Sequence, residues 1–412
     1  MKKIIPYALT CTAALLAGCG GSDDPQRGTL VALPTATVAF SAAEFTASLN
    51  ANAATAPLIT LAGAPVCGVD VRRFQYRTSG AAGENTTATA AIMLPTGTAA
   101  ACTGARPIVL YAHGTATDRN FSMSSFSPTN AGTGEATLVA AMYAAQGFIV
   151  VAPNYVGYDN ATTAVHPYLN AGAQSADMID ALTAARAALP ALPTPRTENG
   201  RLFISGYSQG GYVAMATHRA MQAAGMTVTA SAPLSAPSAI SMLADFSFSG
   251  APALGGTFFT PLLSTSWQRQ FGNVYANIND IYEAQYSATI DNLLPSTESI
   301  TALVTSGRFP ATQALYPTTA TPALAVPSLA PFGFYGPNNL IRASYLASSA
   351  ADIAANPCPG NAFPPTAGSL ATATPLACTP ANGFRRAAVA NDLRNWVPTR
   401  PMLLCGGRND PT

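Results

Sequence analysis

Four short and mainly apolar runs constrain the fold of this chain most strongly. They are residues 107–112 (PIVLYA), 148–152 (FIVVA), 201–205 (RLFIS) and 228–235 (VTASAPLS). Such short runs predict strands that are buried on both faces, as the strands of a parallel sheet are. Helical composition or spacing marks the segments between them, which are residues 134–146, 175–189 and 212–224. This alternation predicts an α/β protein with a mostly parallel sheet and helices on both of its faces.

Two other parts of the chain depart from the alternation. Residues 69–95 hold two alternating runs around the turn-rich stretch SGAAGENTT, which predicts an antiparallel hairpin. Residues 240–399 are rich in Ala, Ser, Thr and Pro and contain helical pieces such as residues 280–294. We interpret them as a lid-like cap inserted into a core made of residues 36–239 and 400–412. Within the second core part, residues 400–407 (RPMLLCGG) predict one more strand.

The N-terminus resembles the export signal of a bacterial lipoprotein. Two lysines precede an apolar stretch that is too short for a confident membrane span, and LLAGC, ending at Cys19, is similar to a lipobox. The resemblance implies a signal peptide over residues 1–18, acyl chains on Cys19 that anchor the protein to a membrane, and a tether over residues 19–35. Gly20 and Gly21 favour the outer membrane of a Gram-negative bacterium. An ordinary secretion signal with an incidental cysteine is the alternative.

The cysteines and the charge balance narrow the possible compartments and partners. With Cys11 removed and Cys19 lipidated, five cysteines remain, and we expect the pairs Cys67–Cys102, around the hairpin, and Cys358–Cys378, around a Pro-rich loop, although other pairings stay open. Cys405 is then left over in an apolar strand. The absence of Cys-x-x-Cys spacing suggests no zinc site, and we expect no metal and no cofactor. A net charge of +1 argues against a nucleic-acid partner.

The hexapeptide GYSQGG, residues 206–211, is the most informative motif. It lies between a predicted strand and a predicted helix, so the chain turns sharply at Ser208 and lifts its hydroxyl above the sheet. Glycines are needed two residues to either side because neighbouring backbone comes too close for a Cβ. The N-terminus of the following helix favours developing negative charge. We therefore predict that Ser208 is a nucleophile, against the alternative of a mere tight turn.

At this point the chain resembles the α/β-hydrolase superfamily, and more narrowly the secretory lipases similar to Candida antarctica lipase A. The matching pieces are residues 111–115 (YAHGT), 152–158 (APNYVGY), 166–169 (HPYL), the GYSQGG motif and the turn GRND, residues 407–410. They cover roughly residues 69–240 and 400–411. The resemblance implies an α/β-hydrolase sheet with a cap, and hydrolysis of carboxylic esters by a Ser-Asp-His triad in that chain order.

Acyl transfer also needs donors for the oxyanion and an acid for the triad. We expect the backbone N–H groups of Gln209 and of Thr115, or a residue close to it, to be the donors, with Gly114 letting the second loop approach. Alternatively, residues 113–114 merely end a strand. Asp410, just past the predicted strand at residues 400–407, is the expected acid. Asp245 is its rival, since some hydrolases place the acid after the preceding strand.

The base is the least determined member of the triad. The chain has three histidines, and the family order requires one after Asp410. His218 lies about 15 Å from Ser208 along the predicted helix, which excludes it. His113 heads the oxyanion loop, and His166 is a weaker candidate for the base than for a structural role. We therefore expect the natural chain to continue beyond Thr412 with a last helix, a last strand and a loop that bears the catalytic histidine.

These features favour an exported, lipid-anchored serine esterase or lipase that forms an acyl-enzyme on a small-molecule or lipid ester. The weakly charged, aromatic-containing stretch in residues 240–335 is either an apolar lid or acyl pocket, or plain core packing. A serine peptidase or amidase would use the same triad residues. A surface lipoprotein that keeps the scaffold only for binding is a third hypothesis.

Overall fold

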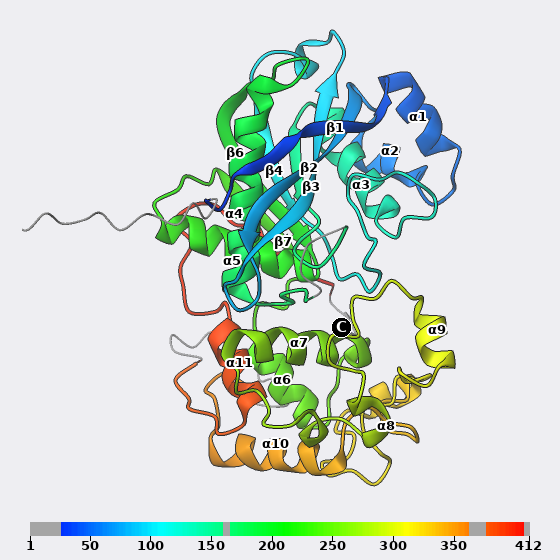
Figure 1. Ribbon diagram of the computed structural model, residues 1–412, viewed down its shortest axis with the longest axis vertical. Coiled ribbons are helices and arrows are strands. Elements are labelled where there is room, and N and C mark those ends of the chain that lie inside the picture. Colours follow the sequence, from blue (N-terminus) through cyan, green and yellow to red (C-terminus); the bar gives the residue numbers. More distant parts are fainter. Residues whose placement is uncertain (1–25, 160–164, 362–375, 408–412) are drawn as a thin grey trace, which may run out of the picture.

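The computed structural model describes residues 26–159, 165–361 and 376–407, and the described chain forms two lobes (Figure 1). The first lobe, the core, contains a seven-stranded sheet in the order β1-β2-β3-β5-β4-β6-β7. The strands are β1 Leu30–Phe40, β2 Gly68–Ser79, β3 Asn85–Thr96, β4 Arg106–Ala112, β5 Ile149–Pro153, β6 Glu198–Tyr207 and β7 Ala230–Leu234. All four strands predicted from apolar runs are present.

The sheet is mixed. Strands β5, β4, β6 and β7 are parallel neighbours, whereas β1, β2 and β3 add to the edge of β5 as antiparallel strands. The hairpin of β2 and β3 pairs without a bulge from Gly68↔Thr96 to Ser79↔Asn85, as predicted. Central strands β4 and β5 are buried almost throughout, because helices cover both faces of a parallel sheet.

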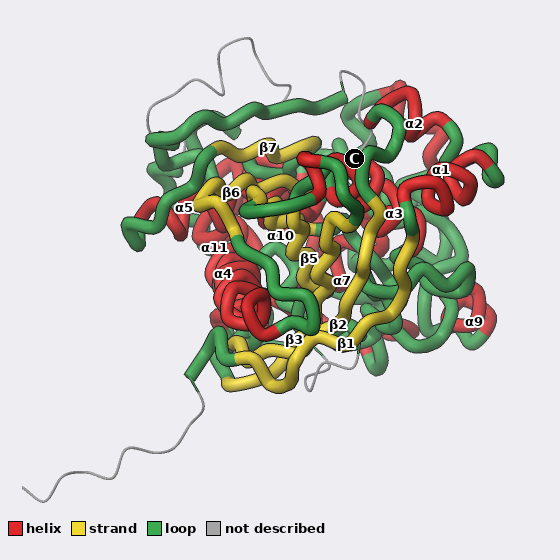
Figure 2. The backbone as a smooth tube through the Cα atoms, turned by 90° about the horizontal axis from the view of Figure 1, so that it is seen from above, coloured by secondary structure: helices red, strands yellow, loops and turns green. Residues whose placement is uncertain are grey.

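Helices cover both faces of this sheet, so the predicted fold class is confirmed (Figure 2). Helices α4 and α5 lie on one face and α1 to α3 on the other. Their bounds are α1 Ala42–Asn50, α2 Pro57–Ala62, α3 Thr133–Met142, α4 Ala171–Ala188 and α5 Gln209–Ala223. The side chain of Asn170 caps α4 by accepting a bond from the backbone of Ala173, and Gly225, at positive φ, follows the end of α5.

One predicted boundary and one predicted strand at the edges of the core differ from the structure. Residues 30–35 belong to β1 and pair with β2, so they are not part of a tether. Residues 400–407 run parallel to β7 but make only two isolated bridges to it, Ser231↔Met402 and Leu234↔Cys405. Proline and glycine in this stretch weaken a regular ladder. Cys405 is exposed rather than buried in a strand.

The second lobe, the cap, follows β7, and its regular secondary structure is helical (Figure 1). Its helices are α6 Ile240–Phe248, α7 Gly256–Phe271, α8 Ala284–Ser287, α9 Ile300–Thr305, α10 Ala343–Ala355 and α11 Gly383–Asn391. The helix expected over residues 280–294 is wrong except for the short α8, because most of this segment consists of turns, with Asn292 at a φ of 62°. Long connections join these helices, so the cap lacks the regular alternation of strands and helices that the core has.

Both predicted disulfides, Cys67–Cys102 and Cys358–Cys378, are present. The first ties the start of β2 to the loop before β4, and the second closes a segment of the cap between α10 and α11. Cys19 and the predicted signal peptide lie outside the described residues. Within the described ranges, no helix is both long and apolar enough to span a bilayer.

Candidate active site

Ser208 occupies a strained turn between β6 and α5. Its φ of 57° and ψ of −121° lie outside the regions that non-glycine residues favour. A Cβ added to Gly206 or Gly210 would overlap the Ala112 carbonyl oxygen, and one added to Gly211 would overlap the Leu234 carbonyl oxygen. The glycines around the serine are therefore required by close backbone packing, as predicted.

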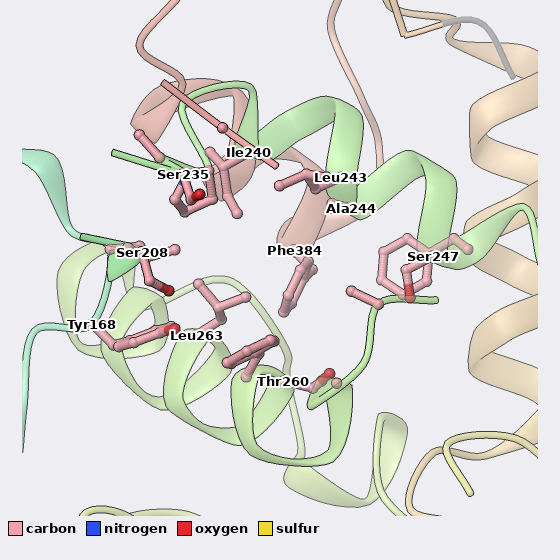
Figure 3. Close-up of a pocket in the computed structure, with 18 of the residues that line it drawn as sticks. Tyr168, Ser208, Ser235, Ile240, Leu243, Ala244, Ser247, Thr260, Leu263 and Phe384 are labelled. Atoms are coloured by element: carbon pink, nitrogen blue, oxygen red, sulfur yellow. The ribbon is translucent and has the colours of Figure 1, made fainter. Parts of the chain in front are cut away.

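The Ser208 side chain is half-buried and reaches a cavity of about 280 Å³ between the core and the cap (Figure 3). Its walls come from α6, α7 and the start of α11, and they are mainly apolar, with Ile240, Leu243, Leu263 and Phe384 among them. The described lining residues include no charged side chain. An uncharged group bound in this cavity would lie beside the serine hydroxyl and displace water from it.

The two predicted oxyanion donors lie on segments that pack together. Gln209 is the first residue of α5, so its N–H has no carbonyl acceptor within the helix. Gly210 packs directly against the backbone of residues 112–113, which brings the loop that carries Thr115 beside the serine turn. The expected role of Gly114 is not supported, because a Cβ there would meet its nearest atom, the Tyr207 carbonyl oxygen, at an ordinary 3.5 Å.

Side chains fix the loop of residues 113–116 on several sides. Three tyrosine hydroxyls bond it: Tyr155 to the His113 carbonyl at 3.0 Å, Tyr158 to the Ala116 carbonyl at 2.6 Å and Tyr168 to the Thr115 hydroxyl at 2.9 Å. Tyr168 also lines the cavity. The Glu135 carboxylate, from α3, accepts the Gly114 N–H at 3.0 Å. A loop held in this way is rigid enough to present a backbone donor.

His166 supports Gln209 instead of acting on Ser208. Its Nδ1 donates to the Val156 carbonyl at 2.8 Å, so its Nε2 accepts from the Gln209 side-chain amide at 2.7 Å. Burial lowers the pKa of His166 to about 3, so the ring is neutral at pH 7. Asp177 continues this chain by accepting the Val156 N–H at 3.1 Å. Both nitrogens of His166 are therefore occupied, which argues against its role as the base.

The other two histidines are also engaged elsewhere. The ring nitrogens of His113 lie 2.7 and 3.1 Å from the carbonyl oxygens of Gly114 and Asn154, and burial lowers its pKa to about 4. His218 pairs through Nδ1 with the Ser231 hydroxyl at 2.8 Å. None of the three imidazoles has a hydrogen bond to Ser208 within the described part of the chain.

The two candidate acids have different positions. Asp410 lies outside the described residues, but Gly406 and Gly407, which precede it closely, line the cavity beside Ser208. Asp245 is buried in an ion pair with Arg385, with Oδ1 2.7 Å from Nε, and accepts a bond from Asn361 as well. A carboxylate committed to these partners is not available to orient a base, so the structure argues against Asp245 as the acid.

Comparison with solved structures identifies the superfamily. The rice cell wall degrading esterase LipA from Xanthomonas oryzae, in a ligand-bound form, matches with a TM-score of 0.70 at 25% identity, over 93% of this chain and 84% of that one. A sequence model of the prolyl oligopeptidase family matches residues 135–234, which contain the serine turn. The chain belongs to the α/β-hydrolase superfamily.

Two other solved structures resemble this α/β hydrolase at lower sequence identity. A protein from Legionella pneumophila matches with a TM-score of 0.63 at 17% identity, over 92% of this chain and 83% of that one, which shows the fold. Candida antarctica lipase A reaches a TM-score of 0.43 at 12% identity, over 64% of this chain and 54% of that one, so the narrower resemblance stays a prediction. No protein in a set of curated proteins matches the chain.

Sequence reasoning missed the groups that hold the site of this hydrolase in place. Glu135 and the contact from His166 to Gln209 have no local signature, because their partners lie 21 and 43 residues away. Tyr168 was noted only as part of a family motif. In the described ranges, no cluster of three or more His, Cys, Asp or Glu side chains could hold a metal ion.

Proposed function

We propose that this α/β hydrolase cleaves carboxylic esters through an acyl-enzyme intermediate on Ser208. The observation that carries the proposal is the position of the half-buried Ser208 side chain, on a strained turn that lines an uncharged, mainly apolar cavity. The Xanthomonas neighbour is described as an esterase, which supports the same reaction class.

In the proposed reaction, the Ser208 oxygen attacks the ester carbonyl and its proton passes to a general base. The backbone N–H groups of Gln209 and Thr115 stabilise the negative charge on the tetrahedral oxygen. Asp410 orients the base and stabilises its cationic form. The three histidines of the chain bond other partners, which argues against each of them as this base. The alcohol leaves with the proton, and the acyl group stays on Ser208. Water then attacks this ester and passes its proton to the base, and Ser208 leaves with that proton as the acid is released.

A serine peptidase or amidase is the second candidate, because the prolyl oligopeptidase family model covers the serine turn. The described cavity walls carry no carboxylate that would recognise an amine, which favours an ester with an apolar acyl group.

We further propose that the protein is exported and anchored through lipid on Cys19, so that the active site works close to a membrane surface. The two disulfides support an oxidising compartment. Metabolic labelling with a radioactive fatty acid, in the native protein and in Cys19→Ala, tests the anchor: label on both proteins would contradict it.

Turnover measurements on the full-length protein and Ser208→Ala test the chemistry. We expect p-nitrophenyl butyrate hydrolysis to fall by roughly 10⁴-fold or more in Ser208→Ala, as in other serine hydrolases, and to be unchanged in Ser48→Ala, which alters an exposed serine of α1. Peptide anilides separate the peptidase from the esterase. Equal, background rates in the wild type and in Ser208→Ala would leave a binding protein as the remaining hypothesis.

A further inference from the structure

Glu135 contacts the oxyanion loop from outside the cavity. It is the third residue of α3, and its Oε1 accepts the Gly114 N–H at 3.0 Å and the Tyr111 hydroxyl at 2.8 Å. Its Oε2 lies 3.3 Å from the same Gly114 nitrogen. Gly114 directly precedes Thr115, so the carboxylate fixes the peptide next to the proposed donor.

The partners of Glu135 are not those of an ordinary helix-terminal carboxylate. A glutamate in the first turn commonly accepts bonds from the N–H groups of its own helix and interacts favourably with the helix dipole. Here the described partners of the carboxylate are Tyr111 on β4 and Gly114 in the following loop. The side chain therefore links α3 to the loop that follows β4.

Glu135 also differs from the other groups that hold this loop. Those groups are tyrosine hydroxyls and the ring of His113, all of which are uncharged at neutral pH, and they bond carbonyl oxygens or the Thr115 side chain. Among the described contacts, Glu135 provides the acceptor for a backbone N–H of the loop. The other groups therefore leave this backbone donor without a partner, and the Glu135 oxygen is the acceptor that fixes it.

We propose that Glu135 is a positioning residue that holds the Thr115 oxyanion donor in register with Ser208 by fixing Gly114. The inference rests on the proposed function of Ser208. An oxyanion donor acts on the transition state rather than on the bound ester, so its displacement lowers kcat and leaves KM nearly unchanged. Because the donor is loosened rather than removed, we expect a loss on the order of 10-fold, smaller than the 10²–10³-fold loss of a deleted donor.

Three variants of the full-length protein separate this role from a merely structural one. Glu135→Leu removes the acceptor, whereas Glu135→Gln keeps an amide oxygen that can accept both bonds. Tyr111→Phe removes the other partner of the same carboxylate and leaves the Gly114 bond in place. We expect kcat for p-nitrophenyl butyrate to fall about 10-fold in Glu135→Leu, and to stay within about 3-fold of the wild type in the other two variants.

Hydrogen exchange followed by mass spectrometry gives a readout that does not depend on turnover. Exchange in a peptide covering residues 113–116 should be faster in Glu135→Leu than in Glu135→Gln or the wild type. Unchanged exchange, an unchanged kcat, or equal losses of kcat in the Leu and Gln variants would each overturn the proposal. If the wild type is no more active than Ser208→Ala, the proposed function fails instead, and the exchange experiment still decides whether Glu135 fixes the loop.

Discussion

The core and the cap of this hydrolase are stabilised in different ways. In the core, strand ladders and close backbone contacts set the position of the serine turn, and a Cβ at Gly206, Gly210 or Gly211 would overlap a neighbouring carbonyl. In the cap, much of the chain is irregular and its helices are tied together by buried side chains. Arg385 of α11, 1% exposed, pairs with Asp245 of α6 and Asp352 of α10.

This difference separates the proposed chemistry from the proposed substrate selection. Residues that place the nucleophile and the oxyanion donors belong to the core, whose backbone geometry leaves little room for change. Most of the cavity wall belongs to the cap, where α6, α7 and α11 supply side chains that can be exchanged without moving the serine turn. A scaffold of this kind can alter its substrate while keeping its reaction.

The largest effect should come from Gly210→Ala in the core, compared with Gly256→Ala in the cap. The new Cβ at residue 210 overlaps the backbone of Ala112 and His113, which cannot move without breaking β4, so we expect a loss above the about 1–3 kcal/mol typical of overpacking and little folded protein. At residue 256 the nearest atom is the end of the Leu315 side chain, which can turn away.

Soluble yield and urea unfolding of the two glycine variants provide the measurement. A folded, fully stable Gly210→Ala protein would contradict the claim that backbone packing fixes the serine turn. A Gly256→Ala protein as unstable as Gly210→Ala would remove the contrast between core and cap.

The next largest effect should come from Arg385→Met in the cap. Removing the guanidinium leaves Asp245 and Asp352 without their cation in a buried site, which typically costs about 3–5 kcal/mol. Arg27→Met in the core breaks a pair with Asp180 in which the arginine is 46% exposed, so a loss of about 0–1 kcal/mol is expected.

Urea unfolding monitored by tryptophan fluorescence measures both arginine variants, since Trp267 lies in α7 of the cap and Trp396 packs against His218 of α5 in the core. The triple variant Arg385→Met, Asp245→Asn, Asp352→Asn should recover part of the loss because no charge stays buried. If Arg27→Met were the more damaging of the two, the cap would not depend on its buried pair.

Prediction from the sequence succeeded in the core because local signals suffice there. Short apolar runs identify central strands, and the glycine spacing around Ser208 reports the close packing of the turn. The edge strand β1 was missed because exposed positions dominate it and its apolar pattern is weak. Strand pairing at an edge depends on the neighbouring strand more than on local composition.

The cap and the supporting contacts of the site could not be predicted for a different reason. Asp245 and Arg385 are 140 residues apart, and His166 and Gln209 are 43 apart, so no spacing rule connects them. A single sequence shows that such polar residues exist but not which of them meet. Asp245 was accordingly a rival for the acid until its partners were known.

The two disulfides give a smaller contrast. Replacing both cysteines of a pair by serine should destabilise the protein by roughly 3 kcal/mol, and by about 0.5 kcal/mol more for Cys67–Cys102 than for Cys358–Cys378, since they close loops of 35 and 20 residues. Thermal unfolding of the two double variants measures the difference. A much larger loss of stability from removing Cys358–Cys378 would show that this disulfide stabilises the cap by more than the entropy of loop closure.

Acid should weaken the core while leaving the Asp352–Arg385 ion pair of the cap intact. Burial lowers the pKa of His113 to about 4 and of His166 to about 3, so the unfolded chain binds more protons below pH 6.5 and stability falls as the pH falls. From pH 7 to 5 each histidine contributes a loss of about 2 kcal/mol. Asp177, whose pKa burial raises to about 7, opposes them with a gain of about 2 kcal/mol. Bonds from Asn382 and Arg385 lower the pKa of Asp352 in spite of its burial, so its contribution to stability is constant above pH 5.

Urea unfolding at pH 7 and pH 5 tests this balance. The wild type should lose about 2 kcal/mol of unfolding free energy on acidification. His166→Gln should lose almost nothing, because it removes one of the two histidine losses and Asp177 offsets the other. Asp177→Asn should lose about 4 kcal/mol, because it removes the carboxyl that offsets the histidines. The same loss in all three proteins would mean that the pH response arises elsewhere. If Asp352→Asn were the variant that changed the loss, the pH response would belong to the cap.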